Sequence, residues 1–358
     1  MTKREQLSVG LIGCGVMGRT LVDSFHKMRD ARVVAVCDPL TPSREGAARA
    51  YEAPAYADYR ELLARPDIGA VVIAAPNHLH RDLAIAAAAA GKHIFCEKPM
   101  ALSLADCDQM IDAAASAGVK LMVGQVLRLM FPFSRMKELA TEGALGLPVC
   151  VDICRLEGPP RIGWRARRDL AGGLLFEMNV HELDLMRHLC GEVQQVSAYG
   201  GHFVRQAVDY ADVCQVNLLF RSGAVGHLHA GCAGAIDTYQ GIVICPTGTL
   251  SFGPEWLVGR LQRDGADEAE MLERVDDAKS DGIDWEVASF VAWVLRDEPP
   301  VVTAFDGRAA VELAEAAYLS MDQGGPVDLP LNCSHRTTSE LGRALHKRNP
   351  SPIRPVPL

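Results

Sequence analysis

The chain has 358 residues, of which 49% are hydrophobic and 23% are charged, and its formal net charge is −9. This length and composition are typical of a globular protein with room for two domains and a large core. The negative charge and the absence of a long basic run argue against binding to nucleic acid. Residues 1–6 are polar, and the alanine-rich run over 83–90 is too short to span a bilayer. We therefore expect a cytoplasmic protein with no membrane partner.

The eleven cysteines include no C-x-x-C pair. Most of them stand in apolar runs, where cysteine behaves as a small hydrophobic residue. We expect buried thiols in a reducing compartment, without disulfides and without a bound metal.

The first 38 residues predict a nucleotide site. Residues 7–12 form an apolar run typical of a buried strand, and the sequence Gly13-Cys14-Gly15-Val16-Met17-Gly18 follows it directly. A helical pattern over 20–29 and a second apolar run over 32–37 lead to Asp38. Strand, glycine turn, helix, strand and acid stand in the order that a dinucleotide site requires, although an isolated glycine motif is also met in ordinary turns.

Each glycine has a physical role in this interpretation. Gly13 makes the tight turn, Gly15 lets the backbone approach a pyrophosphate, and Gly18 lets the helix pack close to the sheet. The N–H groups at the start of the helix, at Val16 and Met17, face the phosphates. Asp38 accepts hydrogen bonds from the adenosine ribose and repels a 2′-phosphate, which favours NAD over NADP, although Arg44 is near enough to hold such a phosphate.

The pattern of alternating elements continues to residue 124. Helices are predicted over 43–51, 59–64, 81–90 and 104–117, and strands over 69–74, 93–96 and 120–124. This alternation predicts an α/β domain over 1–124 with a doubly wound parallel sheet of the Rossmann type. Ligands of such sheets lie beyond the carboxyl ends of the strands, where Asn77, Lys98 and Gln125 stand.

The pattern changes after residue 125. Helices are expected over 132–142, 174–189, 284–295 and 307–321, and strands over 149–156, 195–198, 213–220, 224–230, 239–245 and 249–252. These elements predict an α+β domain over 125–331 with a large open, mostly antiparallel sheet. The free face of this sheet is expected to join subunits in a homo-dimer or homo-tetramer. The tail over 332–358 is expected to be only partly ordered.

Lys98 is the first candidate for chemistry. A lysine at a strand end beside the expected nicotinamide can hydrogen-bond a substrate hydroxyl and, with a lowered pKa, relay a proton. The alternative is a surface lysine without a role.

The second candidate is the helix predicted over 174–189. Its residues Glu177, His181, Asp184 and His188 are spaced to lie on one face. A carboxylate four residues before an imidazole can orient it as a general base. Because two such pairs cannot both reach one carbon atom, we favour Glu177 with His181, which follow the flexible glycines 172 and 173. A polar stripe packed against a neighbouring domain is the alternative.

Several motifs together resemble the Gfo/Idh/MocA oxidoreductases over about residues 9–330. They are the glycine turn, A-P-N-H-L-H at 75–80, A-G-K-H at 90–93, E-K-P at 97–99, the glycines before H-E-L-D at 181–184, and P-V-D-L-P at 326–330. The resemblance implies a catalytic Lys98 with a cis peptide bond before Pro99, and a carboxylate and imidazole pair at Glu177 and His181. The family usually has aspartate where this chain has Glu177.

The resemblance also implies the activity: hydride transfer between NAD, or NADP, and a secondary alcohol or ketone of a sugar, inositol or related cyclic polyol, with aminosugars and nucleotide sugars as further possibilities. An NAD-retaining glycoside hydrolase and a non-catalytic NAD-binding regulator are the alternatives. The expected cofactor contacts are Gly13, Gly15, Val16, Met17, Gly18, Asp38, Pro76, Asn77, His80, Glu97, Lys98 and Gln125.

The resemblance also implies that the substrate contacts both proposed catalytic groups and a further set of side chains. The whole expected set is Lys98, Arg128, Trp164, Arg165, Glu177, His181 and Tyr239, with His227 and His229 near the pocket. Arg161, Arg165, Arg167 and Arg168 form a basic cluster that can bind a carboxylate or a diphosphate. A solvated loop or a subunit contact is the other interpretation of this cluster.

Overall fold

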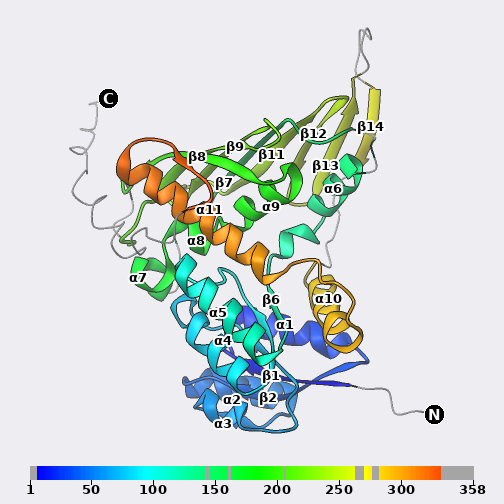
Figure 1. The fold of residues 1–358 in the computed structure, drawn as a ribbon, viewed down its shortest axis with the longest axis vertical. Coiled ribbons are helices and arrows are strands. Elements are labelled where there is room, and N and C mark those ends of the chain that lie inside the picture. The colour runs from blue at the N-terminus through cyan, green and yellow to red at the C-terminus, as the bar shows by residue number, and fades with distance from the viewer. Residues whose placement is uncertain are drawn as a thin grey trace. The chain divides into compact units, whose positions relative to one another are not determined.

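The computed structural model describes residues 6–141, 143, 145–159, 163–204, 207–262, 270–275 and 282–331. The chain forms two compact units (Figure 1). The first consists of Met1–Met130 with Asp281–Val311, and the second of Phe131–Ser280 with Glu312–Leu358. The expected tail over 332–358 and Arg161 lie outside the described residues.

The first unit contains a six-stranded sheet in the order β3-β2-β1-β4-β5-β6, with every neighbouring pair parallel. Its strands are β1 (Leu7–Ile12), β2 (Ala31–Cys37), β3 (Ala55–Tyr56), β4 (Ala70–Ile73), β5 (His93–Cys96) and β6 (Leu121–Val123). The strand order reverses between β1 and β4. In a doubly wound sheet, this reversal marks the edge where ligands bind.

Helices cover both faces of this sheet, which explains why its strands are apolar throughout. On β1, Val9 and Leu11 point toward one face, while Gly10 points toward the other, where Leu62 lies 2.7 Å from the ideal position of a Cβ. The helical elements between the strands are α1 (Val16–Lys27), α2 (Thr41–Tyr51), α3 (Tyr59–Leu63), η1 (Asn77–Leu79), α4 (His80–Ala89) and α5 (Leu104–Ala117), and η2 (Val126–Arg128) follows β6.

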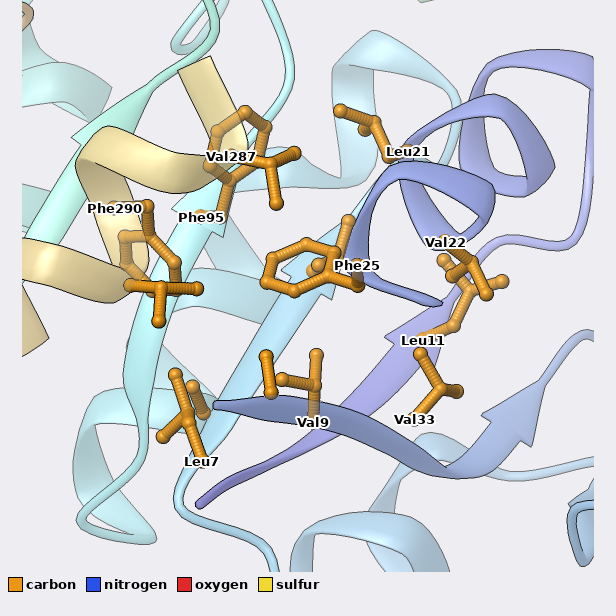
Figure 2. Packing of buried hydrophobic residues seen from close by; sticks show 14 of the residues in the cluster. Leu7, Val9, Leu11, Leu21, Val22, Phe25, Val33, Phe95, Val287 and Phe290 are labelled. Atoms are coloured by element: carbon orange, nitrogen blue, oxygen red, sulfur yellow. The ribbon is translucent and has the colours of Figure 1, made fainter. Parts of the chain in front are cut away.

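A distant helix, α10 (Gly282–Arg296), completes the core of the first unit. Figure 2 shows its Val287 and Phe290 beside β1, β5 and α1. The Phe290 ring centroid lies 6.4 Å from that of Phe25 and 5.7 Å from that of Phe95, in edge-to-face geometry. The compact unit thus includes a segment from the range expected for the second domain. The expected ranges 1–124 and 125–331 remain a prediction.

The second unit contains a nine-stranded sheet in the order β14-β13-β12-β11-β7-β10-β9-β8-β15. All neighbouring pairs are antiparallel except β7 with β10. The strands are β7 (Cys150–Leu156), β8 (Val193–Gly201), β9 (Val213–Phe220), β10 (Val225–Gly231), β11 (Thr238–Cys245), β12 (Gly248–Gly253), β13 (Trp256–Leu261), β14 (Glu270–Val275) and β15 (Val327–Asp328). A parallel doubly wound sheet and a mostly antiparallel sheet confirm the predicted fold class.

One face of this sheet is covered by helices, and the other carries exposed apolar side chains. Helix α9 (Val180–Cys190) packs on β7 and β10, and the hydroxyl of Ser320 in α11 (Ala304–Gln323) accepts a hydrogen bond from the Ala198 N–H of β8. The remaining helical elements of this unit are α6 (Phe133–Thr141), η3 (Gly163–Ala166), α7 (Arg168–Ala171) and α8 (Leu174–Glu177). The opposite face exposes Tyr199, Val225, Ile242 and Ile244.

The single helix predicted over 174–189 is two helices in the structure. Helix α8 ends at Glu177, and α9 begins at Val180 after Asn179, whose φ of −98° and ψ of 4° lie outside the helical range. The Asn179 N–H donates back to the Leu174 carbonyl, and the Asn179 carbonyl accepts from the Leu183 N–H, so one turn closes as the next opens. Glu177 and His181 therefore do not share the face of one continuous helix, and that part of the prediction is wrong.

Candidate active site

Three glycines shape the loop after β1. At two of them, Gly13 and Gly18, a side chain would collide with the backbone, whereas the space beside Gly15 is open. Gly13 has a φ of +99°, and a Cβ on it would lie 2.5 Å from the Ala74 carbonyl oxygen. A Cβ on Gly18 would lie 2.0 Å from the Gly13 carbonyl oxygen. No atom of the described residues lies within 4 Å of the ideal Cβ position of Gly15. The packing of the protein does not require a glycine there, whereas a pyrophosphate approaching the backbone does.

The start of α1 is open beside this loop. Val16 and Met17 occupy its first two positions and are 74% and 37% exposed. The first helical hydrogen bond runs from the Arg19 N–H to the Gly15 carbonyl, so the N–H groups before Arg19 have no partner from within the helix. A helix start with such N–H groups is suited to bind a phosphate.

The Asp38 carboxylate is fixed at the end of β2. Its Oδ2 accepts the Cys14 N–H at 2.9 Å, and its Oδ1 accepts the Leu40 N–H at 2.8 Å. Each carboxylate oxygen retains a lone pair for a ribose hydroxyl. The Arg44 guanidinium donates to the backbone carbonyls of Asp38 and Pro39 at 2.7 and 3.2 Å, which places a cation beside the acid.

Lys98 stands in a turn that continues β5 beyond the sheet. The Glu97 N–H donates to the Ile73 carbonyl at 2.9 Å, and the Glu97 carboxylate accepts the Lys98 N–H at 3.1 Å. The Lys98–Pro99 peptide bond is cis, as predicted. Lys98 is half-buried, whereas Glu97, Asn77 and Gln125 are buried. These residues follow the carboxyl ends of β4, β5 and β6, which are neighbours in the sheet.

His80 is engaged within the protein. Its side chain is fully buried, its Nδ1 lies 2.8 Å from the Pro99 carbonyl oxygen, and its Nε2 lies 2.9 Å from the Ala75 carbonyl oxygen. A direct contact of His80 with the cofactor stays a prediction.

In the second unit, Glu177 forms an ion pair with Arg165. The Arg165 Nε lies 2.9 Å from the Glu177 Oε1, and the Arg165 guanidinium lies over the Trp164 ring, 5.4 Å from its centroid. The Tyr210 hydroxyl donates to the Arg165 carbonyl at 2.9 Å and thereby fixes this segment. Three of the predicted substrate residues are thus brought together. His181, in the first turn of α9, is half-buried, while Asp184 is 1% exposed.

Two other predicted substrate residues are largely occupied by protein contacts. The Arg128 guanidinium lies 3.0 Å from the Asp306 carboxylate, and the Arg128 side chain is only 5% exposed. The Tyr239 ring packs against Phe133 and under the Arg155 guanidinium, and its hydroxyl is buried. Burial raises the pKa of the Tyr239 hydroxyl well above its usual value of 10, and Glu182 adds to this effect.

The described members of the arginine cluster are largely bound within the protein. Arg167 lies 2.6 Å from Asp169, and Arg165 is held by Glu177. The Arg168 guanidinium lies over the Tyr318 ring, 4.3 Å from its centroid. These contacts reduce the positive charge available for a carboxylate or a diphosphate.

Sequence reasoning missed a buried network beside His181. Glu182 is fully buried, and its carboxylate accepts hydrogen bonds from Arg155 at 2.8 Å and from Asn179 at 3.1 Å. Burial alone would lower the pKa of Arg155, but Glu182 and Glu157 raise it overall, so the guanidinium stays charged. The alternation of side chains along β7 could have indicated this network, because it puts Arg155 on the same face as the buried Val151 and Ile153.

The fold and this loop define an NAD-binding oxidoreductase. The sequence pattern described as "Oxidoreductase family, NAD-binding Rossmann fold" matches residues 7–125, and that of the GFO/IDH/MocA C-terminal domain matches residues 133–251. The chain belongs to the Gfo/Idh/MocA oxidoreductase family. NAD is its cofactor, and its glycine loop and Asp38 fit that molecule.

Three relatives illustrate the range of the family. The myo-inositol 2-dehydrogenase of Thermotoga maritima is 30% identical over 346 residues, which are 90% of this chain and 98% of that protein. The 2,7-anhydro-N-acetylneuraminate hydratase of Mediterraneibacter gnavus is 30% identical over 74% of this chain and 72% of its own length. A levoglucosan dehydrogenase solved with NADH has a TM-score of 0.83 and 25% identity over 92% of this chain and all of that one.

No helix among the described residues is both long and apolar enough to cross a membrane. Within the same residues, no group of three histidine, cysteine, aspartate or glutamate side chains is arranged to hold a metal ion.

Proposed function

We propose that this enzyme oxidises a secondary hydroxyl of a sugar, an inositol or a related cyclic polyol with NAD, or reduces the corresponding ketone. The observation that carries the proposal is a half-exposed lysine, Lys98, on the same sheet edge as a glycine loop open to a dinucleotide. The full-length similarity to an inositol dehydrogenase supports the substrate class.

Bound NAD supplies the acceptor for the hydride, and the protein supplies the proton chemistry. In our proposal, the Lys98 ammonium donates a hydrogen bond to the reacting hydroxyl and stabilises the alkoxide charge that develops there. The hydroxyl proton passes to the His181 imidazole, or to Lys98 where that side chain is a neutral amine. Glu177, Arg165 and Trp164 bind other parts of the polyol, since the carboxylate accepts and the guanidinium donates to hydroxyl groups.

A substrate panel tests the proposal. The purified enzyme is mixed with NAD or NADP and with inositols, aldoses, levoglucosan, aminosugars or nucleotide sugars, and NADH formation is followed at 340 nm. We expect stoichiometric NADH from at least one polyol. Failure of the whole panel, with NAD binding intact, would refute the proposed class.

A second candidate is a reaction without net oxidation. One relative is named a hydratase, a word for water addition rather than net hydride transfer. A glycoside hydrolase that retains NAD likewise causes no net oxidation of its substrate. Release of an aglycone or hydration of a 2,7-anhydrosugar, without accumulation of NADH, would favour this candidate. A non-catalytic NAD-binding regulator predicts no turnover of either kind.

We further propose a homo-dimer or homo-tetramer that forms through the open face of the nine-stranded sheet. Val225 and Ile244 both pair with Cys150 in neighbouring strands, so they form a continuous apolar strip with Ile242. Such a strip on an exposed face favours association. Light scattering should give a dimer or a tetramer for the wild-type protein and a smaller species for the variant I242D/I244D, and a monomeric wild type would contradict the proposal.

The cytoplasm is the proposed compartment. The ten cysteines among the described residues are free thiols, and burial raises the pKa of Cys14 and Cys37 to about 12. Thiols that are not paired are typical of a reducing environment. When cells that express the tagged protein are fractionated, the protein should be recovered in the fraction that contains the soluble cytoplasmic marker proteins.

A further inference from the structure

His80 links two turns at the carboxyl edge of the first sheet. It is the first residue of α4, and its side chain is 0% exposed. Its Nδ1 lies 2.8 Å from the Pro99 carbonyl oxygen, and its Nε2 lies 2.9 Å from the Ala75 carbonyl oxygen. A carbonyl oxygen only accepts hydrogen bonds, so each contact requires an N–H on the ring. The neutral ring makes one such bond at a time, and the imidazolium makes both.

The two carbonyls belong to turns with different roles. Ala75 follows β4 and lies against the glycine loop, since a Cβ on Gly13 would come within 2.8 Å of the Ala75 nitrogen. Pro99 follows Lys98 directly. The imidazole therefore lies between the turn that packs on the dinucleotide loop and the turn that carries Lys98.

A buried polar contact of this kind is costly to lose. A buried carbonyl or ring nitrogen that loses its hydrogen-bond partner is unfavourable. The backbone around Lys98 therefore has a strong preference for the position in which Pro99 meets the imidazole. The Lys98 N–H is fixed independently by the Glu97 carboxylate at 3.1 Å, so the turn is held on both sides of the lysine.

We propose that His80 is a positioning residue for Lys98: its Nδ1 ties the lysine's turn to the start of α4 and keeps the ammonium at the distance from the cofactor that turnover requires. This inference rests on the proposed role of Lys98 in catalysis. A displacement of about 1 Å at a reacting group can cost about 100-fold in rate, which sets the size of the expected effect.

The ring geometry offers two matched variants. In His80→Asn, the side-chain amide nitrogen takes the place of Nδ1 and can still donate to Pro99. In His80→Gln, the amide nitrogen takes the place of Nε2 and can donate to Ala75 but not to Pro99. His78, exposed on the same segment, gives the control His78→Gln.

Two measurements test the proposal on the full-length enzyme. Hydrogen exchange, measured by mass spectrometry over residues 97–102, reports how firmly the His80 contact holds the turn that carries Lys98, and it needs no substrate. Steady-state kinetics with NAD and myo-inositol, or the best polyol of the panel, give kcat and KM, and calorimetry gives the Kd for NAD.

We expect His80→Gln to exchange faster over 97–102 and to lose about 100-fold in kcat, with KM and the Kd for NAD within about threefold of wild type. His80→Asn should stay within about fivefold of wild type in kcat, and His78→Gln should match it. Equal exchange and kcat in all three variants would overturn the proposal, as would a loss of NAD binding in both His80 variants. If the wild-type enzyme turns over no polyol while His80→Gln still exchanges faster, the proposed function is refuted, but the contact by which His80 holds the Lys98 turn is supported.

Discussion

At the scale of single residues, we predict that Asp38 decides which dinucleotide the enzyme prefers. Its two carboxylate oxygens accept the N–H groups of Cys14 and Leu40, so the charge is fixed at the end of β2. Replacement by serine removes the charge and one or two charge-assisted hydrogen bonds, each of about 1.5–3 kcal/mol.

For Asp38→Ser, we therefore expect KM for NAD to rise about 10- to 100-fold and KM for NADP to fall, helped by the nearby Arg44. Initial rates at varied cofactor concentration measure both constants. An unchanged ratio of the two KM values would show that Asp38 does not distinguish the ribose of NAD from that of NADP.

Glu177 replaces the aspartate that the family resemblance predicts, and its longer side chain reaches Arg165. Shortening it to aspartate removes one methylene and stretches the 2.9 Å contact. Because the Arg165 side chain is 39% exposed, the free energy of unfolding should change by less than about 1 kcal/mol.

We expect Glu177→Asp to raise KM for the polyol several-fold without changing the Kd for NAD. Asp169→Ala, which breaks the exposed contact with Arg167 at 2.6 Å, is the matched control and should leave KM unchanged. A polyol KM equal to that of wild type in Glu177→Asp would remove this pair from the substrate site.

His93 makes stability depend on pH. Burial, with a smaller effect of Lys120, holds the pKa of its imidazole below the usual 6.5. The Lys120 N–H donates to the His93 Nδ1 at 3.0 Å, a contact that needs an unprotonated nitrogen. Below pH 6.5 the unfolded chain binds the proton first, so the free energy of unfolding falls as the pH drops from 6.5 to the folded pKa.

Urea denaturation between pH 7.5 and pH 5 should therefore show a loss of stability in wild type that is smaller in His93→Gln. Parallel curves for the two proteins would contradict the assignment of this loss to His93.

At the scale of elements, η2 is fixed by an ion pair at its last residue. Arg128 and Asp306 are 3.0 Å apart, with side chains 5% and 19% exposed, and Asp306 also accepts the Thr303 N–H at 2.9 Å. Removing one member of a buried pair leaves the other charge without compensation, at a cost of about 3–5 kcal/mol.

We expect Arg128→Met to lower the free energy of unfolding by about 3 kcal/mol and to leave the polyol KM within about threefold of wild type. Arg296→Met, at a half-exposed ion pair, is the control and should cost less than about 1 kcal/mol. A raised KM with unchanged stability would instead support the substrate contact predicted for Arg128.

Helix and strand positions follow closely from the sequence wherever one element is long and regularly patterned. The strand over 7–12 and the helix over 104–117 match β1 and α5 at both ends. The interruption at Asn179 was missed because leucine, phenylalanine and methionine continue the helical pattern through it. The hydrogen bonds that divide the segment involve Leu174, Leu183 and Glu182, and their joint effect is not visible in periodicity.

At the scale of the whole molecule, the alternation of strands and helices predicts a parallel sheet followed by a mostly antiparallel one. The return of α10 to the first core could not be predicted, because Phe290 lies 265 residues after Phe25 and 195 residues after Phe95 in the sequence. The strands β13 and β14 were also missed. Charged residues such as Arg260 and Glu273 interrupt their apolar pattern.

The glycine loop and Lys98 could be located from the sequence because each belongs to a motif that directly follows a predicted strand. The internal partners of Arg128, Tyr239 and His80 could not, because each partner comes from a separate segment: Asp306, Arg155 and the Ala75 and Pro99 carbonyls. The sequence predicts ligand contacts for these polar side chains but gives no sign of the contacts that they make within the protein.

The central claim is that Lys98 handles charge and proton at the reacting hydroxyl while the glycine loop binds NAD independently. The most direct measurement compares wild type with Lys98→Met, and with Lys98→Arg, which keeps a charge but transfers no proton. It combines NADH formation at 340 nm with the Kd for NAD from calorimetry. We predict that kcat falls about 100- to 10,000-fold in both variants while the Kd for NAD stays within about threefold. A Lys98→Met enzyme that turns over polyol at the wild-type rate would contradict the account.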